Sequence, residues 1–387
     1  MSKLISLNHN FISPWKFYNP VEIFVGSKCR EQLLDRLEHK VLIVTTKRGR
    51  AQILSDEILS KLSKKSILWI DSVVENPSLQ YLQEEVNKNK DANFDSVVAF
   101  GGGSAIDAAK IINLMLSAEC KSYSIYELIA SPNLYRDARL KPLYAIPTTS
   151  GTGSEVTPFA TVWDLIEKRK FSLSGDLMFP TAAFIDADLT ISMPKMVSIS
   201  TGLDVLSHAL EAIWNKNANP ITFSFASHAL QLCFEALPQI SSGNHDPQVR
   251  KKMAEASVFA GLAISHTRTA LSHSISYPIT SHYGVPHGFA CAFTLVAVLR
   301  LNLKAEDGRF SRLAKDLCGS SDTLSLLHVV QKICQKLEVA STVKQYIPSI
   351  ESLFELEAEM YAPGRFENNL MPVSGLNEIL LESCRAL

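Results

Sequence analysis

One aspartate and three histidines in the second half of the chain have side chains that bind divalent metals. Asp204 and His208 stand four residues apart in the segment TGLDVLSH, so both lie on one face of a predicted helix. His273 and His287 follow in the segments LSH and VPHG. One carboxylate and three imidazoles suit a first-row metal such as Fe²⁺ or Zn²⁺. The chain contains 10 histidines, so hydrogen-bonded core histidines are the alternative interpretation.

A glycine-rich turn suggests a place for a phosphate group. The sequence GGGS, from Gly101 to Ser104, separates an apolar run over 96–100 from a good helix start over 105–110. Glycines let the backbone approach a ligand closely, and the N-terminus of a helix offers free N–H groups to a phosphate. The turn is not the GxGxxG fingerprint, so a purely structural tight turn is the alternative.

A second loop strengthens this interpretation. Residues 146–155 read IPTTSGTGSE and directly follow another short apolar run. Their hydroxyls and free N–H groups suit hydrogen bonds to phosphate, ribose or the nicotinamide amide, although a flexible connector has the same composition. Ligands bind at the carboxyl ends of strands in α/β sheets, and two such loops together favour a nucleotide site.

The end of the first predicted strand indicates which nucleotide binds. An acidic residue there would hold the ribose 2′-hydroxyl of NAD. The strand instead ends in Thr45 and Thr46, and Lys47, Arg48 and Arg50 follow. These cations favour the 2′-phosphate of NADPH, unless they are only the solvated start of a helix.

The elements that must position these residues change character along the chain. Short apolar runs predict strands over 40–46, 67–70, 96–100, 144–146 and 182–185, with helices over 51–62 and 79–89. This alternation predicts a mostly parallel sheet covered on both faces. Beyond residue 191, helical spacing recurs over 197–215, 222–237, 246–263, 290–303, 322–336 and 376–387. We therefore predict a Rossmann-like α/β domain over 1–190, which binds the nucleotide, and an all-α domain over 191–387, which binds the metal.

Composition excludes several other classes of protein. The 387 residues carry a net charge of −1, which gives no electrostatic footprint for nucleic acid. The seven cysteines are scattered without a CxxC pair, which is typical of a reducing compartment. The N-terminus has no apolar signal-peptide core, and no run of 18 uninterrupted apolar residues predicts a transmembrane helix. We expect a cytoplasmic protein.

Taken together, these motifs resemble the iron-containing (group III) alcohol dehydrogenase family. The matching segments, in the family's order, are FDSVVAFGGGSAIDAAK, IPTTSGTGSEVT, PTAAFIDADLTISMP, STGLDVLSHALEA, LSH and VPHG. The resemblance implies a dehydroquinate-synthase-like architecture with the active site between the two domains. It also implies a homodimer or a higher homo-oligomer.

The resemblance carries residue roles with it. It implies a metal site made of Asp204, His208, His273 and His287. It implies a nucleotide site made of Thr46, Asn76, Gly102, Gly103, Ser104, Asp107, Thr148, Thr149, Thr152, Thr157 and Lys170. Lys170 also falls near the nicotinamide or the substrate. Thr46 stands where NAD-preferring relatives have an aspartate, in agreement with the preference for NADPH.

One position departs from the family. Four residues after the third metal ligand the family usually has another histidine, often drawn into proton transfer, and this chain has Tyr277. A tyrosine hydroxyl can relay a proton, but it does not titrate near neutral pH as imidazole does. We expect Tyr277, water or a ribose hydroxyl to supply the proton.

A finer resemblance concerns the substrate. The segments RTALSHSISYPIT and GVPHGFACAFTL are similar to the phosphonoacetaldehyde reductase branch, which reduces phosphonoacetaldehyde to 2-hydroxyethylphosphonate. A phosphonate needs cations, and the candidates are Arg268 and Lys170. An ion pair inside the helical domain is the alternative role for Arg268.

The expected activity is metal-dependent interconversion of a small aldehyde and its primary alcohol with NAD(P)H, with phosphonoacetaldehyde as the candidate substrate. The first alternative is a general short-chain alcohol dehydrogenase or aldehyde reductase. A dehydroquinate-synthase-like lyase, which regenerates its nucleotide in each cycle, and a non-catalytic binding protein are the remaining ones.

Overall fold

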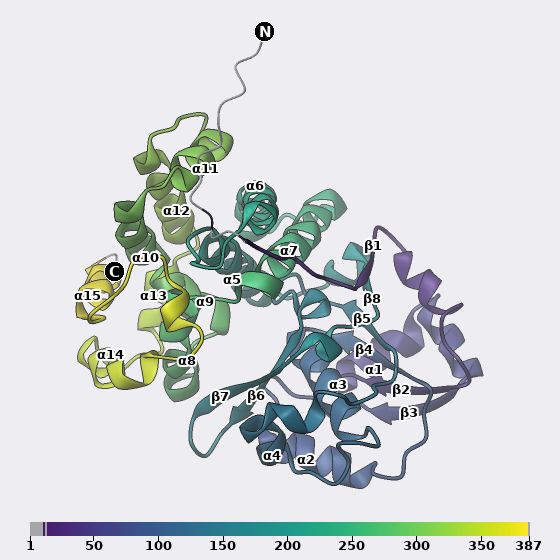
Figure 1. The fold of residues 1–387 in the computed structure, drawn as a ribbon. Helices are drawn as coiled ribbons and strands as arrows, with labels where there is room; N and C mark the ends of the chain where they lie inside the picture. The colour runs from purple at the N-terminus through teal and green to yellow at the C-terminus, as the bar shows by residue number, and fades with distance from the viewer. Residues whose placement is uncertain (1–10, 12–13, 386–387) are drawn as a thin grey trace.

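The computed structural model describes Phe11 and residues 14–385. Its first part holds a six-stranded sheet in the order β1-β8-β5-β4-β2-β3, and every pairing is parallel (Figure 1). The strands are β1 (Glu22–Val25), β2 (Lys40–Val44), β3 (Ser66–Ile70), β4 (Ser96–Gly101), β5 (Leu143–Pro147) and β8 (Ala182–Ile185). The five predicted strands are therefore confirmed, and β1 is an additional edge strand.

The order of the strands places the predicted nucleotide loops together. From β2 the chain passes through α1 (Lys47–Ser55) to β3 on one side, then through α2 (Leu79–Lys88) to β4 on the other. Ligands of open α/β sheets bind where the strand order reverses in this way. Thr46, which caps α1, and the GGGS turn, which leads into α3 (Gly103–Met115), lie at the ends of these two central strands.

A predicted helix of the α/β part is divided in two. The helix expected over 51–62 is α1 followed by a 3₁₀-helix, Leu59–Lys64. Asp56 stands between them in extended backbone, and its carboxylate accepts hydrogen bonds from the N–H groups of Ile58 and Leu59. This local capping ends α1 early, because the side chain competes with the helical hydrogen bonds.

A β-hairpin that the sequence analysis did not predict projects from the α/β part toward the helices (Figure 1). Its strands are β6 (Phe159–Asp164) and β7 (Arg169–Ser174), which pair antiparallel. The Trp163 N–H donates to the carbonyl of Pro77, which ties β6 to the loop before α2. On the opposite side β7 contacts α8 (Leu271–Tyr283), so the hairpin bridges the two parts of the chain.

Helices make up the second part, and the described residues after Ile185 contain no strand. Besides α8, the helices are α5 (Lys195–Ile213), α6 (Pro220–Ser241), α7 (Pro247–Thr267), α9 (His287–Phe293), α10 (Leu295–Asn302), α11 (Arg309–Cys318), α12 (Thr323–Lys336), α13 (Val339–Lys344), α14 (Glu351–Glu355) and α15 (Asn377–Arg385). A short α4 (Ile125–Ala130) belongs to the α/β part. The predicted fold class is confirmed, while the exact division at residue 190 stays a prediction.

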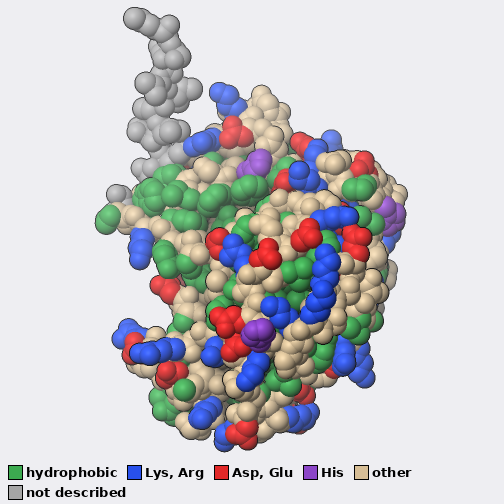
Figure 2. Space-filling view, turned by 90° about the vertical axis from the view of Figure 1, so that its right-hand side faces the viewer, with side chains coloured by type: hydrophobic (Ala, Val, Ile, Leu, Met, Phe, Trp, Pro, Cys, Tyr) green, Lys and Arg blue, Asp and Glu red, His purple; other side chains and the backbone are tan. Residues whose placement is uncertain are grey.

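The face of the molecule shown in Figure 2 is not dominated by one sign of charge. Lys and Arg side chains lie there among Asp and Glu side chains. This mixture agrees with the net charge of −1.

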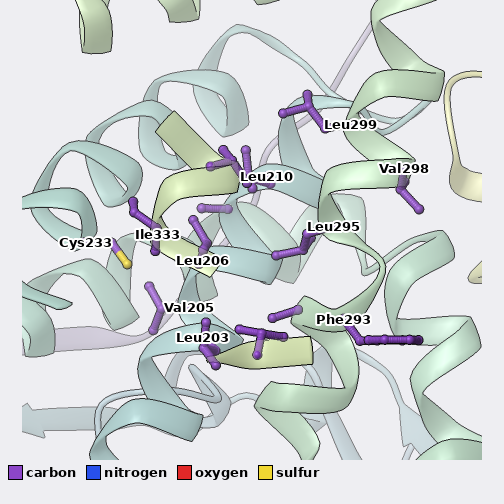
Figure 3. Packing of buried hydrophobic residues seen from close by; sticks show 14 of the residues in the cluster. Leu203, Val205, Leu206, Leu210, Cys233, Phe293, Leu295, Val298, Leu299 and Ile333 are labelled. Atoms are coloured by element: carbon purple, nitrogen blue, oxygen red, sulfur yellow. The ribbon is translucent and has the colours of Figure 1, made fainter. Parts of the chain in front are cut away.

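Aliphatic side chains from several helices form the core of the second part. Figure 3 shows Leu206 and Leu210 of α5, Leu295 of α10 and Ile333 of α12 gathered in one cluster. The helical run His287–Ala305 is long and apolar enough to cross a membrane by length and composition, but 67% of its apolar window is buried inside the protein. Because core helices pass the same test, this burial accounts for its composition.

Two glycines let the loop after β5 pack directly on α7. Gly153 has φ +62°, and a Cβ built on it would lie 2.5 Å from the Cα of Gly261. A Cβ on Gly261 would lie 2.8 Å from both the Gly153 Cα and the Val156 Cγ2. Backbone therefore meets backbone where the hydroxyl-rich loop rests on the helical part.

We predict that Gly261→Ala lowers the free energy of unfolding by about 1–3 kcal/mol, because the added methyl group has no space. Chemical denaturation followed by circular dichroism measures the change. The control is Gly375→Ala, where the nearest atom to the new Cβ is Glu357 Oε1 at 3.7 Å. Equal stability of the two variants would contradict this close approach.

Candidate active site

Three helices bring the predicted metal ligands together around one carboxylate oxygen. Asp204 Oδ1 lies 3.3 Å from His273 Nε2, 3.5 Å from His208 Nε2 and 4.0 Å from His287 Nε2. The rings of His208 and His273 stack with their centroids 4.7 Å apart. Asp204 and His208 come from α5, His273 from α8 and His287 from the start of α9.

The glycine of the VPHG segment allows α9 to begin this close to α5. A Cβ on Gly288 would lie 1.7 Å from the carbonyl oxygen of Ser200, so only glycine fits there. The Gly288 N–H also donates to Ser200 Oγ over 3.3 Å. This contact holds the adjacent His287 over the first turns of α5.

Two buried polar atoms at the centre of the cluster have no hydrogen-bond partner among the described residues. Asp204 Oδ1 and His273 Nε2 are buried, and neither makes a hydrogen bond. Leaving such atoms unsatisfied is costly, so their convergence calls for a bound group that accepts lone pairs. A divalent cation meets that demand, and the donor set of carboxylate oxygen and imidazole nitrogens fits Fe²⁺ or Zn²⁺.

The electrostatics favour the metal-binding forms of Asp204, His208 and His287. For His273 burial alone would lower the pKa, but the neighbouring Cys291, Glu211 and Asp204 outweigh it and raise that pKa. Burial lowers the pKa of His208 to about 4, so its imidazole is neutral and keeps a free lone pair at neutral pH. Burial alone would raise the pKa of Asp204, but its interactions with His208, His273 and His287 outweigh it and hold that pKa well below its usual range. Asp204 is therefore a carboxylate.

Cys291 is a donor near the site that the sequence analysis missed. It lies one turn after His287 on α9, and its Sγ is 3.7 Å from both ring nitrogens of that histidine. One donor atom each from Asp204, His273, His287 and Cys291 lies within 4.8 Å of the others. The spacing of four residues between His287 and Cys291 was the available signal.

Glu211 is the second missed residue, and it orients His273. Its fully buried carboxylate faces the His273 Nδ1 over 2.6 Å and accepts from the backbone N–H of the same residue over 3.1 Å. The Ala270 N–H donates to it over 2.8 Å. A carboxylate behind a histidine in this way fixes the ring so that the other nitrogen points at the metal. Glu211 lies three residues after His208, on the same side of α5.

The cluster opens into a cleft between the α/β part and the helices. The cleft has a volume of about 790 Å³ including its open mouth. Of the residues predicted to bind nucleotide or substrate, those that line it are Asn76, Gly103, Ser104, Asp107, Thr152, Thr157, Lys170 and Tyr277. Thr46, Gly102, Thr148 and Thr149 lie outside its lining, at or next to the strand ends, where Gly102 is packed against Thr149.

Both carboxylate oxygens of Asp107 accept hydrogen bonds from other groups of the protein. One carboxylate oxygen accepts from the Ser154 hydroxyl, and the other accepts from the Thr161 N–H over 2.8 Å. The buried Lys110 on the same helix donates to the carbonyls of Ser154 and Thr157 over 2.7 and 2.8 Å. These bonds make α3 the anchor for both the hydroxyl-rich loop and the hairpin, and a contact of Asp107 with the nucleotide stays a prediction.

Lys170 and Tyr277 meet across the cleft. The ammonium group of Lys170, on β7, lies 4.2 Å from the centre of the Tyr277 ring on α8 and 5.4 Å from that of Trp163. Burial alone would raise the pKa of Tyr277, but the charges of Lys170, Arg365 and His273 outweigh it and lower that pKa below its usual value. The phenol is therefore a better proton donor than an ordinary tyrosine.

Arg268 does not lie where its place in the sequence suggested. It is exposed at the end of α7 with φ +61°, and its guanidinium donates to Ser174 Oγ over 3.2 Å. It is absent from the lining of the cleft and lines a second hollow behind the hairpin. The four residues between Arg268 and His273 include the turn from α7 into α8, which directs the two side chains to different places. The alternative of an ion pair is also not seen, since its described partner is a hydroxyl.

Two family models together match most of this chain. "Iron-containing alcohol dehydrogenase" matches residues 20–187, and "Fe-containing alcohol dehydrogenase family, C-terminal" matches residues 198–358. The NAD-dependent methanol dehydrogenase of Bacillus methanolicus is 31% identical over 83% of this chain and 85% of its own length. The NADPH-dependent butanol dehydrogenase of Clostridium saccharobutylicum is 29% identical over 86% of each chain.

The chain belongs to the iron-containing alcohol dehydrogenase family. It is an NAD(P)-dependent oxidoreductase that interconverts alcohols and aldehydes at a metal site. Among solved structures, the sulfoacetaldehyde reductase of Bifidobacterium kashiwanohense in complex with NAD⁺ is 30% identical, with a TM-score of 0.83 over 96% of this chain and 98% of that one. These matches favour the dehydrogenase over the lyase and over a non-catalytic protein.

For this iron-containing dehydrogenase we predict that Glu211→Gln weakens metal binding by about 10- to 100-fold, because His273 loses its orienting carboxylate. Metal content after dialysis against a graded chelator measures the effect. Glu235→Gln is the control, since Glu235 is an exposed carboxylate paired with Lys252. Unchanged metal retention in Glu211→Gln would contradict the assigned role.

Proposed function

We propose that this enzyme reduces a small aldehyde that carries an anionic group, with NADPH as the hydride donor. The candidate substrate is phosphonoacetaldehyde, and its product is 2-hydroxyethylphosphonate. The observation that carries the proposal is Lys170, a cation in the metal-bearing cleft with no carboxylate within 4.0 Å among the described residues. A site for propanal or butanal has no need of such a charge.

The assignment of the metal ligands is part of the proposal. Asp204, His208, His273 and His287 would hold Fe²⁺, with Zn²⁺ as the second possibility. The bound cation supplies a Lewis acid that polarises the aldehyde carbonyl. The thiol of Cys291 lies among these donors, with its Sγ 3.7 Å from both ring nitrogens of His287, so it is a further candidate ligand.

The nucleotide would lie along the ends of β2 and β4, with its phosphates at the start of α3. Gly102, Gly103 and Ser104 offer backbone N–H groups there, and Thr148, Thr149, Thr152 and Thr157 offer hydroxyls next to them. Lys47 and Arg48 beside Thr46 support the preference for NADPH. Arg50 supports it less, because it pairs with Asp71 over 2.8 Å.

Protein residues would hold the substrate and supply the proton. Lys170 neutralises the anionic group, and the Tyr277 hydroxyl gives a proton to the oxygen of the reduced carbonyl. The homodimer or higher oligomer and the cytoplasmic location remain predictions. A general short-chain aldehyde reductase is the second candidate. It is supported by the similarity of this chain to a methanol dehydrogenase and a butanol dehydrogenase.

We predict that the Fe²⁺-loaded enzyme oxidises NADPH faster with phosphonoacetaldehyde than with propanal or glycolaldehyde. The decrease in absorbance at about 340 nm under anaerobic conditions measures each kcat/KM, with NADH in a parallel series. The phosphonate makes charge-assisted hydrogen bonds that the neutral aldehydes lack. Equal or faster turnover of propanal would leave a general aldehyde reductase.

We predict that aldehyde reduction by the wild type declines as pH rises through the pKa of Tyr277. The protonated phenol is the donor, so the rate is full below this pKa and lost above it. Because that pKa is lowered, the decline begins at lower pH than for an ordinary tyrosine.

Tyr277→Phe should lower kcat by about 100-fold or more and abolish this alkaline decline. Tyr283→Phe is the matched control on α8, since its hydroxyl donates only to the carbonyl of Ser352 in the described structure. A wild-type pH profile in Tyr277→Phe would instead assign the proton to water or to a ribose hydroxyl.

A further inference from the structure

Arg365 is a buried guanidinium without a counter-ion. It precedes the 3₁₀-helix Phe366–Asn368 and is 9% exposed. Its Nη1 donates to the carbonyl of the adjacent Gly364 over 3.0 Å, and its guanidinium carbon lies 5.9 Å from the centre of the Phe159 ring. No carboxylate among the described residues lies within 4.0 Å of it.

Such an arrangement is unusual because arginine is rarely buried unless it is paired. The guanidinium carries five N–H donors and its charge cannot be removed by deprotonation. Among the other arginines with a similar degree of burial, Arg30 bonds to Asp56 and Asp186, and Arg309 bonds to Asp307. Arg250 has no carboxylate partner either, but its guanidinium contacts the Ser198 hydroxyl and the His245 ring. Arg365 differs from all three because it lines the cleft of the metal ligands, where a bound anion can pair with it.

The position of Arg365 shows where that anion would come from. Arg365 lines the cleft that contains Lys170, Tyr277 and the metal-ligand cluster. It also lines the hollow behind the hairpin, which we call the outer hollow and which is bordered by Arg169, Arg268 and Tyr361. Arg365 and Lys170 belong to both spaces, so these two cations stand where the cleft and the outer hollow join.

We propose that Arg365 binds the anionic group of the substrate together with Lys170, and that Arg268 does not contact that group. The part of this inference that concerns the reaction rests on the proposed function. The part that concerns binding of the anion does not. The planar fork of a guanidinium bonds two oxygens of a phosphonate, sulfonate or carboxylate at once, whereas an ammonium acts as a point charge. Arg365 provides the specificity, and Lys170 adds charge beside Tyr277.

The same residue would select against neutral aldehydes. A short neutral aldehyde at the metal leaves the buried guanidinium unpaired, and a site built to bond a group rejects analogues that lack it. Preference for an anionic substrate therefore has two sources. One is the contact between Arg365 and the anion, and the other is the cost of leaving Arg365 unpaired when a neutral aldehyde binds.

Binding of methylphosphonate, a non-reactive anion, tests the inference on the metal-loaded enzyme with NADPH bound. Calorimetry should show that Arg365→Gln weakens this binding by about 10- to 100-fold, the range for a charge-assisted hydrogen bond. Arg365→Lys should recover part of the loss, because it keeps the charge without the fork. Arg268→Gln, the matched control, should change the dissociation constant by less than about threefold.

Kinetics provide the second measurement. In Arg365→Gln the ratio of kcat/KM for phosphonoacetaldehyde to that for propanal should fall at least 10-fold below the wild-type ratio. NADPH binding and thermal unfolding establish whether each variant is folded. If Arg365→Gln does not fold, the same ratio measured in Arg365→Lys tests the inference. An unchanged ratio together with unchanged methylphosphonate binding overturns the inference, as does a larger effect of Arg268→Gln.

The outcomes separate this inference from the proposed function. If the wild type reduces no anionic aldehyde but binds methylphosphonate through Arg365, the proposed substrate is wrong and the anion subsite stands. If the wild type prefers phosphonoacetaldehyde and the Arg365 variants keep that preference, the substrate stands and this subsite is wrong.

Discussion

The buried carboxylate of Glu211 is the constraint on which the geometry of the metal site depends. It faces the His273 ring and accepts from two backbone N–H groups at the start of α8, so it fixes both the side chain and the helix that carries it. Removing a carboxylate from water is expensive, and the cost is offset only where its hydrogen bonds are complete. Here three bonds converge on one group without exposure to solvent. Asp204 and Glu211 are both on α5. This one helix therefore supplies the carboxylate near His273 Nε2 and the carboxylate that faces His273 Nδ1.

Close backbone contacts then set the distances between elements. Gly288 brings α9 against Ser200 of α5, and Gly261 brings α7 against Gly153 of the hydroxyl-rich loop. Neither contact leaves room for a Cβ atom, so the positions of His287 and of the hydroxyl-rich loop are fixed by backbone rather than by adaptable side chains. If this loop binds the nucleotide as proposed, such a site would keep the metal ligands and the hydride donor at a constant separation, as hydride transfer requires.

The parts of the molecule that follow local rules could be predicted from the sequence. The buried strands of the sheet read as short apolar runs, and Asp204 and His208 could be assigned to one helix face from their spacing. Glu211 could have been found from the same spacing, because it lies one further turn along α5. The hairpin of β6 and β7 could not be predicted so readily: its sequence mixes charged and apolar residues around an exposed tip at Leu165 and Ile166. Its place depends on Pro77 and Asp107, which are distant in the chain.

The candidate residues for anion binding show why nearness in sequence is a poor guide to nearness in space. Arg268 stands five residues from His273, yet a left-handed residue conformation at the end of α7 directs it to the outer hollow. Arg365 stands more than ninety residues from His273 in a segment without periodic structure, and yet it lines the same cleft. Only the folded chain brings Arg365, Lys170 and Tyr277 together. Functional sites depart from the local rules that stabilise the rest of a protein. A charge left unpaired there lowers stability until a bound ligand pairs with it. Arg365, which has no carboxylate partner among the described residues and lines the cleft of the metal ligands, departs from the local rules in this way, and for that reason it is our candidate for contact with the substrate.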